Sequence, residues 1–171
     1  MNELARAIFD IALIRRGPED LPASPFLMKL SLLAYVCLSA VGAAFYTDGV
    51  GELLSQVGLD IALVYGFFGI LLLIHRKVGR FPQTMTAVFG TGTLLYLFRL
   101  PLDVWLRTLP EGASATLPAI CILLLAIWSV IITGHILHRA IEIPFIGGIV
   151  LGIAFFVMNV FVYATLFPAT S

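Results

Sequence analysis

Four polar side chains lie within or beside long apolar stretches of this sequence: Asp60, Arg99, Asp103 and Asn159. Ionisable groups inside a bilayer are costly, and where they occur they commonly belong to substrate paths, proton relays or ion pairs. Arg99 and Asp103 are four residues apart, so on a continuous helix they share a face and can pair. By their types and positions, these residues could bind a substrate or carry a proton.

The charged members of this set also have a purely structural interpretation. Asp60 lies two residues into an apolar stretch, where the positive end of the helix dipole favours a solvated carboxylate. Arg99 and Asp103 flank Pro101, so we expect a partly solvated ion pair near the membrane surface, with Asp60 as a candidate third member. On this interpretation they anchor the fold and bind nothing.

The last apolar stretch carries two features that favour helix packing. Asn159 is its deepest strongly polar side chain, and we expect a hydrogen bond across helices, with Ser129 or Thr133 as partner. Gly148 and Gly152 are four residues apart, so they share a face and let another helix backbone come close. That contact can lie within one bundle or between two copies, and we favour the first.

The three histidines, His75, His135 and His138, fall near the ends of two apolar stretches. In bis-histidine haem proteins, two helices each place one imidazole at the same depth in the membrane. The adjacent Arg76 and Arg139 favour a cationic rim instead, because the helix C-terminus attracts positive charge. We therefore expect no haem, no other cofactor and no metal. Metal, phosphate-loop and serine-nucleophile motifs are absent from the sequence, so nothing indicates an enzyme.

The elements that position these side chains are five apolar stretches, each long enough to cross a bilayer. About 20 apolar residues span a hydrocarbon core about 30 Å thick, and such runs must be helical to satisfy their own backbone. With 60% hydrophobic and 12% charged residues, little of the 171-residue chain is left for a water-soluble domain. The sequence predicts an all-α, polytopic bundle of five transmembrane helices at residues 27–46, 58–75, 84–102, 115–138 and 143–167.

The pattern of residues 2–16 predicts a short amphipathic helix before the first span. Its polar and apolar faces recur at helical spacing: Glu3, Arg6 and Asp10 against Leu4, Ile8 and Ile11. We expect this helix to lie in the membrane interface; alternatively, it packs onto the ends of its own spans or onto a partner. The chain then divides into a cytoplasmic helix and linker, 1–26, and a five-helix transmembrane domain, 27–171.

The basic residues are distributed unequally between the two sides of this predicted bundle. Eight of the ten fall on one side: Arg6, Arg15, Arg16, Lys29, Arg76, Lys77, Arg80 and Arg139. Since short loops rich in Lys and Arg stay cytoplasmic, we expect the N-terminus inside and the C-terminus on the far side. No cleavable signal is visible. The expected location is a cell membrane, the inner membrane if the chain is bacterial.

Two segments of the sequence resemble the Yip family of five-span membrane proteins, which are named for interaction with Ypt/Rab GTPases. Residues 79–84 (Gly-Arg-Phe-Pro-Gln-Thr) resemble the family's basic turn, and residues 126–130 with 134–140 resemble its fourth-span ending. The family's acidic cytoplasmic region and its Tyr-Gly-x-x-Pro signature are missing; residues 64–68 (Val-Tyr-Gly-Phe-Phe) lack the proline. The resemblance implies a non-enzymatic protein of membrane organisation, without GTPase binding.

We therefore expect a binding, scaffold or assembly subunit of a larger membrane complex. Its partners would be the bilayer, other membrane subunits and, as a further candidate, a second copy of itself, but not nucleic acid, since the net charge is zero. The alternatives are a small carrier or channel that uses the four polar side chains, or a b-haem electron-transfer subunit. The candidate contact positions outside the four are Arg76, Lys77, Arg80, His135, Gly148 and Gly152. Polar groups that converge on one cavity would favour the carrier.

Overall fold

The computed structural model describes residues 2–47, 49–110 and 113–167, and these form α-helices and two short 3-10 turns with no strand. In chain order the elements are α1 (Asn2–Ala12), η1 (Pro18–Asp20), α2 (Pro25–Ala43), α3 (Val50–Ile74), η2 (Val78–Arg80), α4 (Phe81–Arg107), α5 (Thr116–Ile141) and α6 (Phe145–Leu166). The helices α2 to α6 are long and apolar enough to cross a membrane. This confirms the predicted all-α bundle and makes the chain a multi-pass membrane protein.

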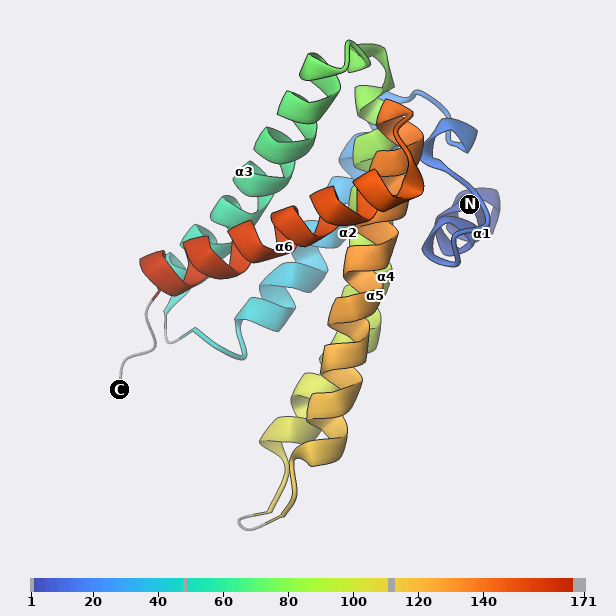
Figure 1. Cartoon of the computed structure of the whole chain (residues 1–171). Coiled ribbons are helices and arrows are strands. Elements are labelled where there is room, and N and C mark those ends of the chain that lie inside the picture. Colours follow the sequence, from blue (N-terminus) through green and yellow to red (C-terminus); the bar gives the residue numbers. More distant parts are fainter. Residues whose placement is uncertain (1, 48, 111–112, 168–171) are drawn as a thin grey trace.

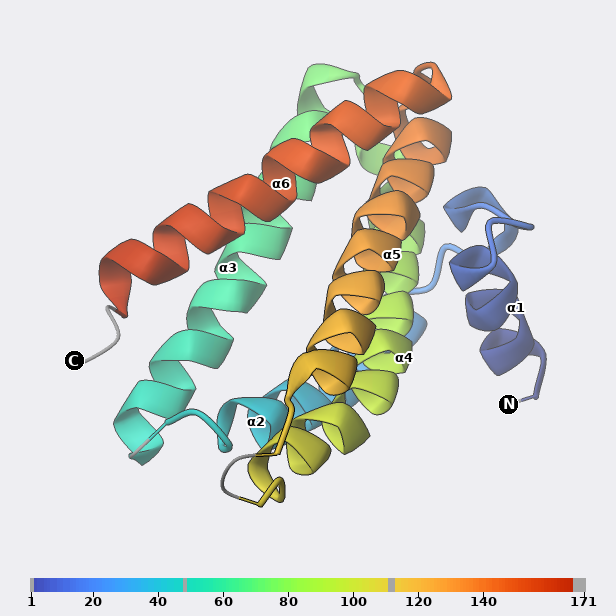
Figure 2. The ribbon, with the colours of Figure 1, turned by 60° about the horizontal axis from the view of Figure 1, so that its bottom comes forward.

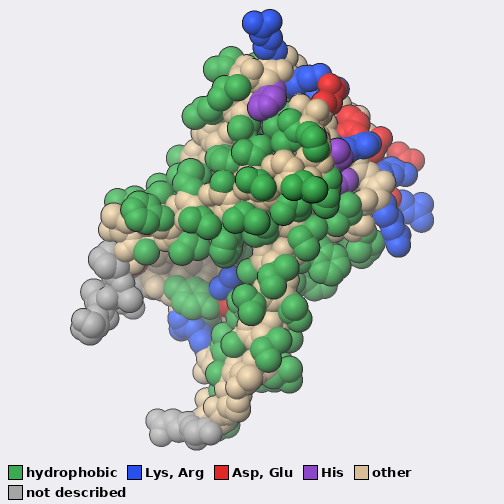
Figure 3. Space-filling view, in the orientation of Figure 1, with side chains coloured by type: hydrophobic (Ala, Val, Ile, Leu, Met, Phe, Trp, Pro, Cys, Tyr) green, Lys and Arg blue, Asp and Glu red, His purple; other side chains and the backbone are tan. Residues whose placement is uncertain are grey.

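The outer surface of the bundle suits lipid contact. Large apolar side chains on α3 and α6 are more than half exposed, among them Leu54, Ile70, Ile146 and Phe161. Figure 3 shows hydrophobic side chains over most of one flank, while charged side chains gather at one corner. A soluble protein rarely exposes such a continuous apolar surface, so the exposure supports a membrane setting.

The helices α3 and α4 run well beyond the limits that the hydropathy pattern predicts. α3 begins at Val50 instead of residue 58, because polar residues such as Glu52 and Gln56 lower the hydropathy of its first turns without breaking the helix. α4 runs through Pro101 to Arg107, five residues beyond the predicted limit at 102 (107 − 102 = 5). Both extensions move residues that were expected at helix ends into continuous helix.

The connections define two ends of the bundle. The turns after α3 and α5 lie at one end with η1, and this end is called the basic end because Lys77, Arg80 and Arg139 lie there. The connections from α2 to α3 and from α4 to α5 lie at the opposite end (Figure 1). α4 and α5 run side by side, whereas α6 leaves α5 at the basic end and crosses toward α3 (Figure 2).

Backbone contact holds α5 and α6 together where they meet. Gly148 and Gly152 are buried against α5, and an added Cβ would overlap the carbonyl oxygen of Gly134 at the first and of Val130 at the second. Only glycine allows this approach. The prediction that the Gly148–Gly152 face packs within the bundle is confirmed.

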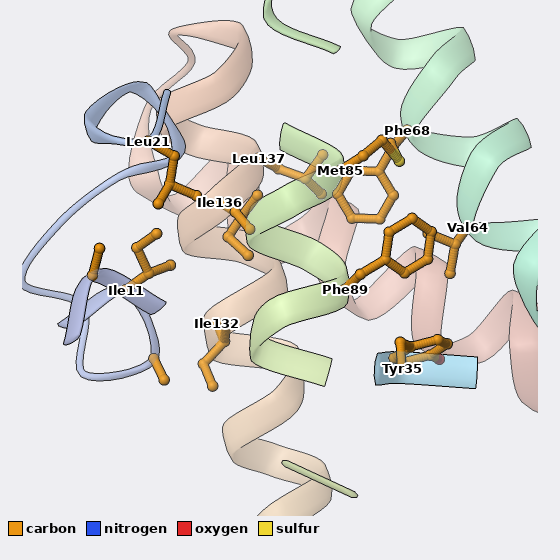
Figure 4. Close-up of a cluster of buried hydrophobic side chains, with 13 residues drawn as sticks. Ile11, Leu21, Tyr35, Val64, Phe68, Met85, Phe89, Ile132, Ile136 and Leu137 are labelled. Atoms are coloured by element: carbon orange, nitrogen blue, oxygen red, sulfur yellow. The ribbon is translucent and has the colours of Figure 1, made fainter. Parts of the chain in front are cut away.

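The main core joins the N-terminal segment to the spans. Ile11 and Leu21 point toward Ile132 and Ile136 of α5, while Phe89 extends from α4 toward α3 (Figure 4). The backbone of the segment is bound as well, because the indole Nε1 of Trp128 donates to the carbonyl of Ala12 at 3.0 Å. The apolar face of α1 therefore packs on the protein's own spans, the second of the two arrangements predicted for it, and α1 ends at Ala12 instead of residue 16.

Candidate functional site

Asp60 lies in the middle of a helix. It follows Val50 by ten residues, about 15 Å along α3, so the interpretation as a solvated carboxylate at a helix start is wrong. The phenol of Tyr35 on α2 donates a short hydrogen bond to Oδ2 of Asp60. In the described part of the chain no Lys, Arg or His forms an ion pair with this carboxylate.

Arg99 and Asp103 form the predicted pair, with 3.3 Å between Nε and Oδ2. α4 is continuous through Pro101, so the i,i+4 geometry is intact. The expected partial solvation is wrong for one partner: the side chain of Asp103 is 2% exposed, whereas that of Arg99 is 43% exposed. Asp103 also has a partner outside its own helix, Tyr46 of the α2–α3 connection.

Tyr46 completes the environment of Asp103. Its hydroxyl donates to Oδ1 of Asp103 at 2.6 Å, and the guanidinium of Arg107 lies 5.4 Å from its ring centroid. Partial burial of the hydroxyl raises the pKa of Tyr46, and the hydrogen bond to Asp103 raises it further. The phenol therefore stays neutral and keeps donating at physiological pH.

A cleft opens on the flank of the bundle, where α5 and α6 diverge. Its volume is about 370 Å³, and it is lined by α2, α3, α4, α5 and α6. The walls are mainly apolar, with Ile122 and Ala126 on α5 facing Phe155 and Phe156 on α6. Figure 3 shows the hollow below α6, with basic and acidic side-chain atoms visible inside it.

The polar end of this cleft collects three of the four polar residues singled out in the sequence. Asp60 of α3, Arg99 of α4 and Asn159 of α6 all line it, together with Tyr35 and Tyr96. Asp103 does not line the cleft, but it forms an ion pair with Arg99, which does. Residues from separate helices thus meet at one place.

A second cavity lies toward the opposite end of the bundle and is here called the vestibule. Its volume is also about 370 Å³, and it is lined by Tyr46, Gln56, Asp103 and Tyr163 among others. Asp60, Tyr96 and Arg99 line both cavities. These three side chains therefore form the partition between the vestibule and the cleft.

Asn159 does not make the interhelical hydrogen bond expected of it. Its Nδ2 donates to the carbonyl of Phe155 on the same helix at 2.8 Å, and Ser129 bonds its own helix through the carbonyl of Ala126. The prediction fails because the two helices diverge below their glycine contact, so the side chains face each other across the cleft. Asn159, Ser129 and Thr133 line it instead.

The basic turn residues hold two connections together at the basic end. Lys77 Nζ and Arg80 Nη2 bind the two carboxylate oxygens of Glu142 at 2.6 Å and 2.5 Å, and Arg80 Nη1 donates to the carbonyl of Arg139 at 3.2 Å. These hydrogen bonds, first from Lys77 and then from Arg80, lower the pKa of Glu142. Arg76, with a φ of 56°, is exposed.

His135 is buried, whereas the cationic-rim interpretation predicts a solvated side chain. Its Nε2 donates to the carbonyl of Arg16 at 2.8 Å, and its Nδ1 has no hydrogen-bond partner in the described ranges. His75 is exposed at the end of α3 and bonds the carbonyl of Leu71. Within those same ranges no three metal-ligating side chains come together. His135 thus anchors the segment that follows α1.

Four tyrosines near the polar residues were not among the residues singled out in the sequence. Tyr35, Tyr46, Tyr96 and Tyr163 surround the polar residues, and Tyr163 donates to the carbonyl of Gln56 at 2.8 Å, which ties α6 to α3. A tyrosine hydroxyl inside an apolar span needs a hydrogen-bond partner. That requirement, applied to Tyr35 and Tyr96, was the available signal.

Comparisons with protein-family models, curated proteins and solved structures find no match to this chain.

Proposed function

We propose that this protein is a small membrane carrier that binds an amphipathic, membrane-resident molecule in the α5–α6 cleft and moves it without chemical change. One observation carries the proposal: Asp60, Arg99 and Asn159 converge on a single cleft from three helices. Polar side chains that served only to anchor separate helices would have no reason to share a cavity. Their convergence is the feature that favours the carrier among the functions predicted from the sequence.

The shape and lining of the cleft support an amphipathic ligand. A volume of about 370 Å³ falls in the range of small-molecule sites, which are mostly apolar with a few placed polar groups. The apolar walls of α5 and α6 suit a hydrocarbon body. At the polar end, Nε of Arg99 is taken by Asp103, so the other guanidinium donors remain for acceptor oxygens of a polar head.

The assembly role predicted from the sequence has less support, because the features proposed to contact partners are used within the molecule. The apolar face of α1 packs on α4 and α5, the basic residues Lys77 and Arg80 bind Glu142, and the Gly148–Gly152 face packs on α5. A partner would have to compete with these contacts. This consideration favours a function located in the cleft.

We also propose that the basic end faces the cytoplasm and the opposite end the far side. The reason is that Lys77, Arg80 and Arg139 all lie at one end of the bundle, as the positive-inside rule requires of a cytoplasmic face. A ligand head at Arg99 then lies toward the far side of the membrane, next to the vestibule.

Photolabelling of the purified protein in lipid nanodiscs tests the proposed function. The probe is a fatty acid with a diazirine on its chain, an amphiphile that reaches the cleft from the bilayer. We expect labelled residues to concentrate on the cleft walls, at positions such as Ile122 and Phe156. The variant Ala126→Trp fills the cleft, and we expect it to abolish this labelling.

The matched control is Leu124→Trp, because Leu124 lies two residues away on the outer face of α5 and is 58% exposed. This variant should keep the wild-type labelling of the cleft. Equal labelling of the cleft and of the outer face of α3, or cleft labelling that survives Ala126→Trp, would overturn the proposal.

A further inference from the structure

The carboxylate of Asp60 is the one charge of the polar cluster that lacks a countercharge among the described residues. Arg99 lies at the same partition, but its Nε is bound to Asp103. The direct donor to Asp60 is the neutral phenol of Tyr35. Asp60 is only partly exposed. A carboxylate in that setting with one neutral donor is disfavoured, and binding a proton removes that penalty.

The groups that face Asp60 come from each helix packed around it. Tyr35 belongs to α2, Tyr96 and Arg99 belong to α4, and Tyr163 belongs to α6. The remaining charges nearby, Arg99 and Asp103, cancel each other as a pair. Near Asp60, a proton is therefore the simplest cation that can compensate the carboxylate.

The two cavities differ in the polarity of their linings and therefore in whether water is expected in them. The vestibule is lined by polar groups at the opposite end, including Gln56, Asp103 and the hydroxyls of Tyr46 and Tyr163. The cleft wall along α5 is mainly apolar, with Ser129 and Thr133 as its polar members, and the cleft opens on the flank that we assign to lipid. Water is expected in the first and not in the second, because hydrocarbon holds almost none.

We propose that Asp60 is a proton-binding site that exchanges protons with water at the opposite end of the bundle through the vestibule. On binding, the proton passes from vestibule water to an Oδ of Asp60, which becomes a neutral carboxylic acid; on release, it returns to that water. No other bond changes. The neutral acid remains hydrogen-bonded to Tyr35, so the partition keeps its structure in both states. This exchange needs no ligand in the cleft and is separate from the proposed carrier function.

Infrared titration of the ligand-free protein in nanodiscs tests the protonation. The carbonyl stretch of a protonated carboxyl group is measured as the pH is raised, with wild type compared to Asp60→Asn. We expect a carboxylic-acid band that persists where exposed acids have ionised and that is lost in Asp60→Asn. Glu52→Gln is the matched control, since Glu52 is an exposed acid on the same helix, and the band should survive it.

Tyr35→Phe keeps the carboxyl group and removes its donor, so it should shift the band without abolishing it. This second variant keeps the test valid if Asp60→Asn fails to fold. A wild-type protein without the persistent band, or a band unaffected by both Asp60→Asn and Tyr35→Phe, would overturn the proton site.

Thiol accessibility tests the route. In a Cys37→Ser/Cys121→Ser background, single cysteines at Gln56 in the vestibule and at Ala126 in the cleft are exposed to a membrane-impermeant thiol reagent in proteoliposomes. We expect Gln56→Cys to react and Ala126→Cys to stay unmodified. Modification at Ala126 with none at Gln56 would show that water reaches Asp60 through the cleft, and the proposed route would be wrong.

Discussion

The hydroxyl of Tyr46 donates a hydrogen bond to Oδ1 of Asp103 at 2.6 Å, and Arg99 binds the other carboxylate oxygen of the same residue. One buried carboxylate thus connects the segment after α2 to two turns of α4. Tyr46 from the α2–α3 connection and Arg99 from α4 each bind one carboxylate oxygen of Asp103. Asp103 therefore holds the wall of the vestibule in place.

Replacement of Asp103 should therefore destabilise the protein measurably. Asp103→Asn removes the charge that Arg99 binds while keeping an acceptor for Tyr46. We expect a loss of about 1.5–3 kcal/mol in the free energy of unfolding, the usual range for a hydrogen bond to a charged group. Thermal unfolding in detergent, followed by circular dichroism, measures it. Glu52→Gln, on the exposed start of α3, should change little, and equal stability of the two variants would contradict the burial of Asp103.

The glycine contact between α5 and α6 should tolerate no side chain. Gly148→Ala places a Cβ against the carbonyl oxygen of Gly134 and the side chain of His138, so the helices must separate. We expect a loss of about 1–3 kcal/mol in stability, as for overpacked cores. Gly66→Ala is the control, because nothing lies near an added Cβ there, and it should be neutral or gain about 0.5–1 kcal/mol. Unfolding in detergent compares the two.

The acid stability of the basic end should depend on Glu142. Hydrogen bonds from Lys77 and Arg80 lower the pKa of Glu142 below its usual value of 4.5. A carboxylate with a lowered folded pKa adds stability that is fully present above the unfolded pKa and is lost as the pH falls through the folded pKa. The stability advantage of wild type over Glu142→Gln should thus be constant near neutral pH and decline below about pH 4.5. Melting temperatures across this range measure it, and a pH-independent difference would contradict the lowered pKa.

The attachment of α1 should depend on its buried face alone. Ile11 is fully buried between α1 and the spans, whereas Phe9, two residues earlier, is 47% exposed. Ile11→Ala should cost about 2–5 kcal/mol, as in other well-packed cores, and should increase amide hydrogen exchange along α1. Phe9→Ala should leave that exchange nearly unchanged. Equal effects of the two variants would mean that α1 does not dock as described.

The proposed orientation predicts the activity of fused reporters. A reporter that works only in the cytoplasm should be active after Arg80 or Arg139, which lie at the basic end, and inactive after Ser171. Ser171 itself lies outside the described residues. Reporter activity at Ser171 would overturn the five-span topology, since an odd number of crossings must separate it from the N-terminus.

The number and order of the spans could be predicted because uninterrupted apolar runs of this length have one solution in a bilayer. The limits of α3 could not, since Glu52 and Gln56 resemble a loop in hydropathy although they continue the helix. Asp60 was consequently placed near an end when it lies in the middle. The error for Asp103 has a different origin, because its hydrogen-bond partner Tyr46 lies 57 positions away in the sequence.

The residues of the candidate site could be predicted from the sequence, but their convergence on one cleft could not. Asp60, Arg99 and Asn159 attract attention as polar groups in apolar helices, and all three line the cleft. Their convergence depends on the angle at which α6 leaves α5, which no local pattern encodes. The expected hydrogen bond from Asn159 to Ser129 or Thr133 fails for the same reason, since Asn159 bonds the carbonyl of Phe155 on its own helix.

The glycine contact between α5 and α6 has a consequence for how a molecule would enter the cleft. Gly134, Gly148 and Gly152 bring the two backbones together at the basic end only, and farther along the helices stand apart. For the proposed carrier, a ligand diffusing in the plane of the membrane would therefore slide between them without any helix having to open. Its arrival would be governed by its concentration in the bilayer, whereas its departure toward the opposite end would require the partition of Asp60, Tyr96 and Arg99 to yield.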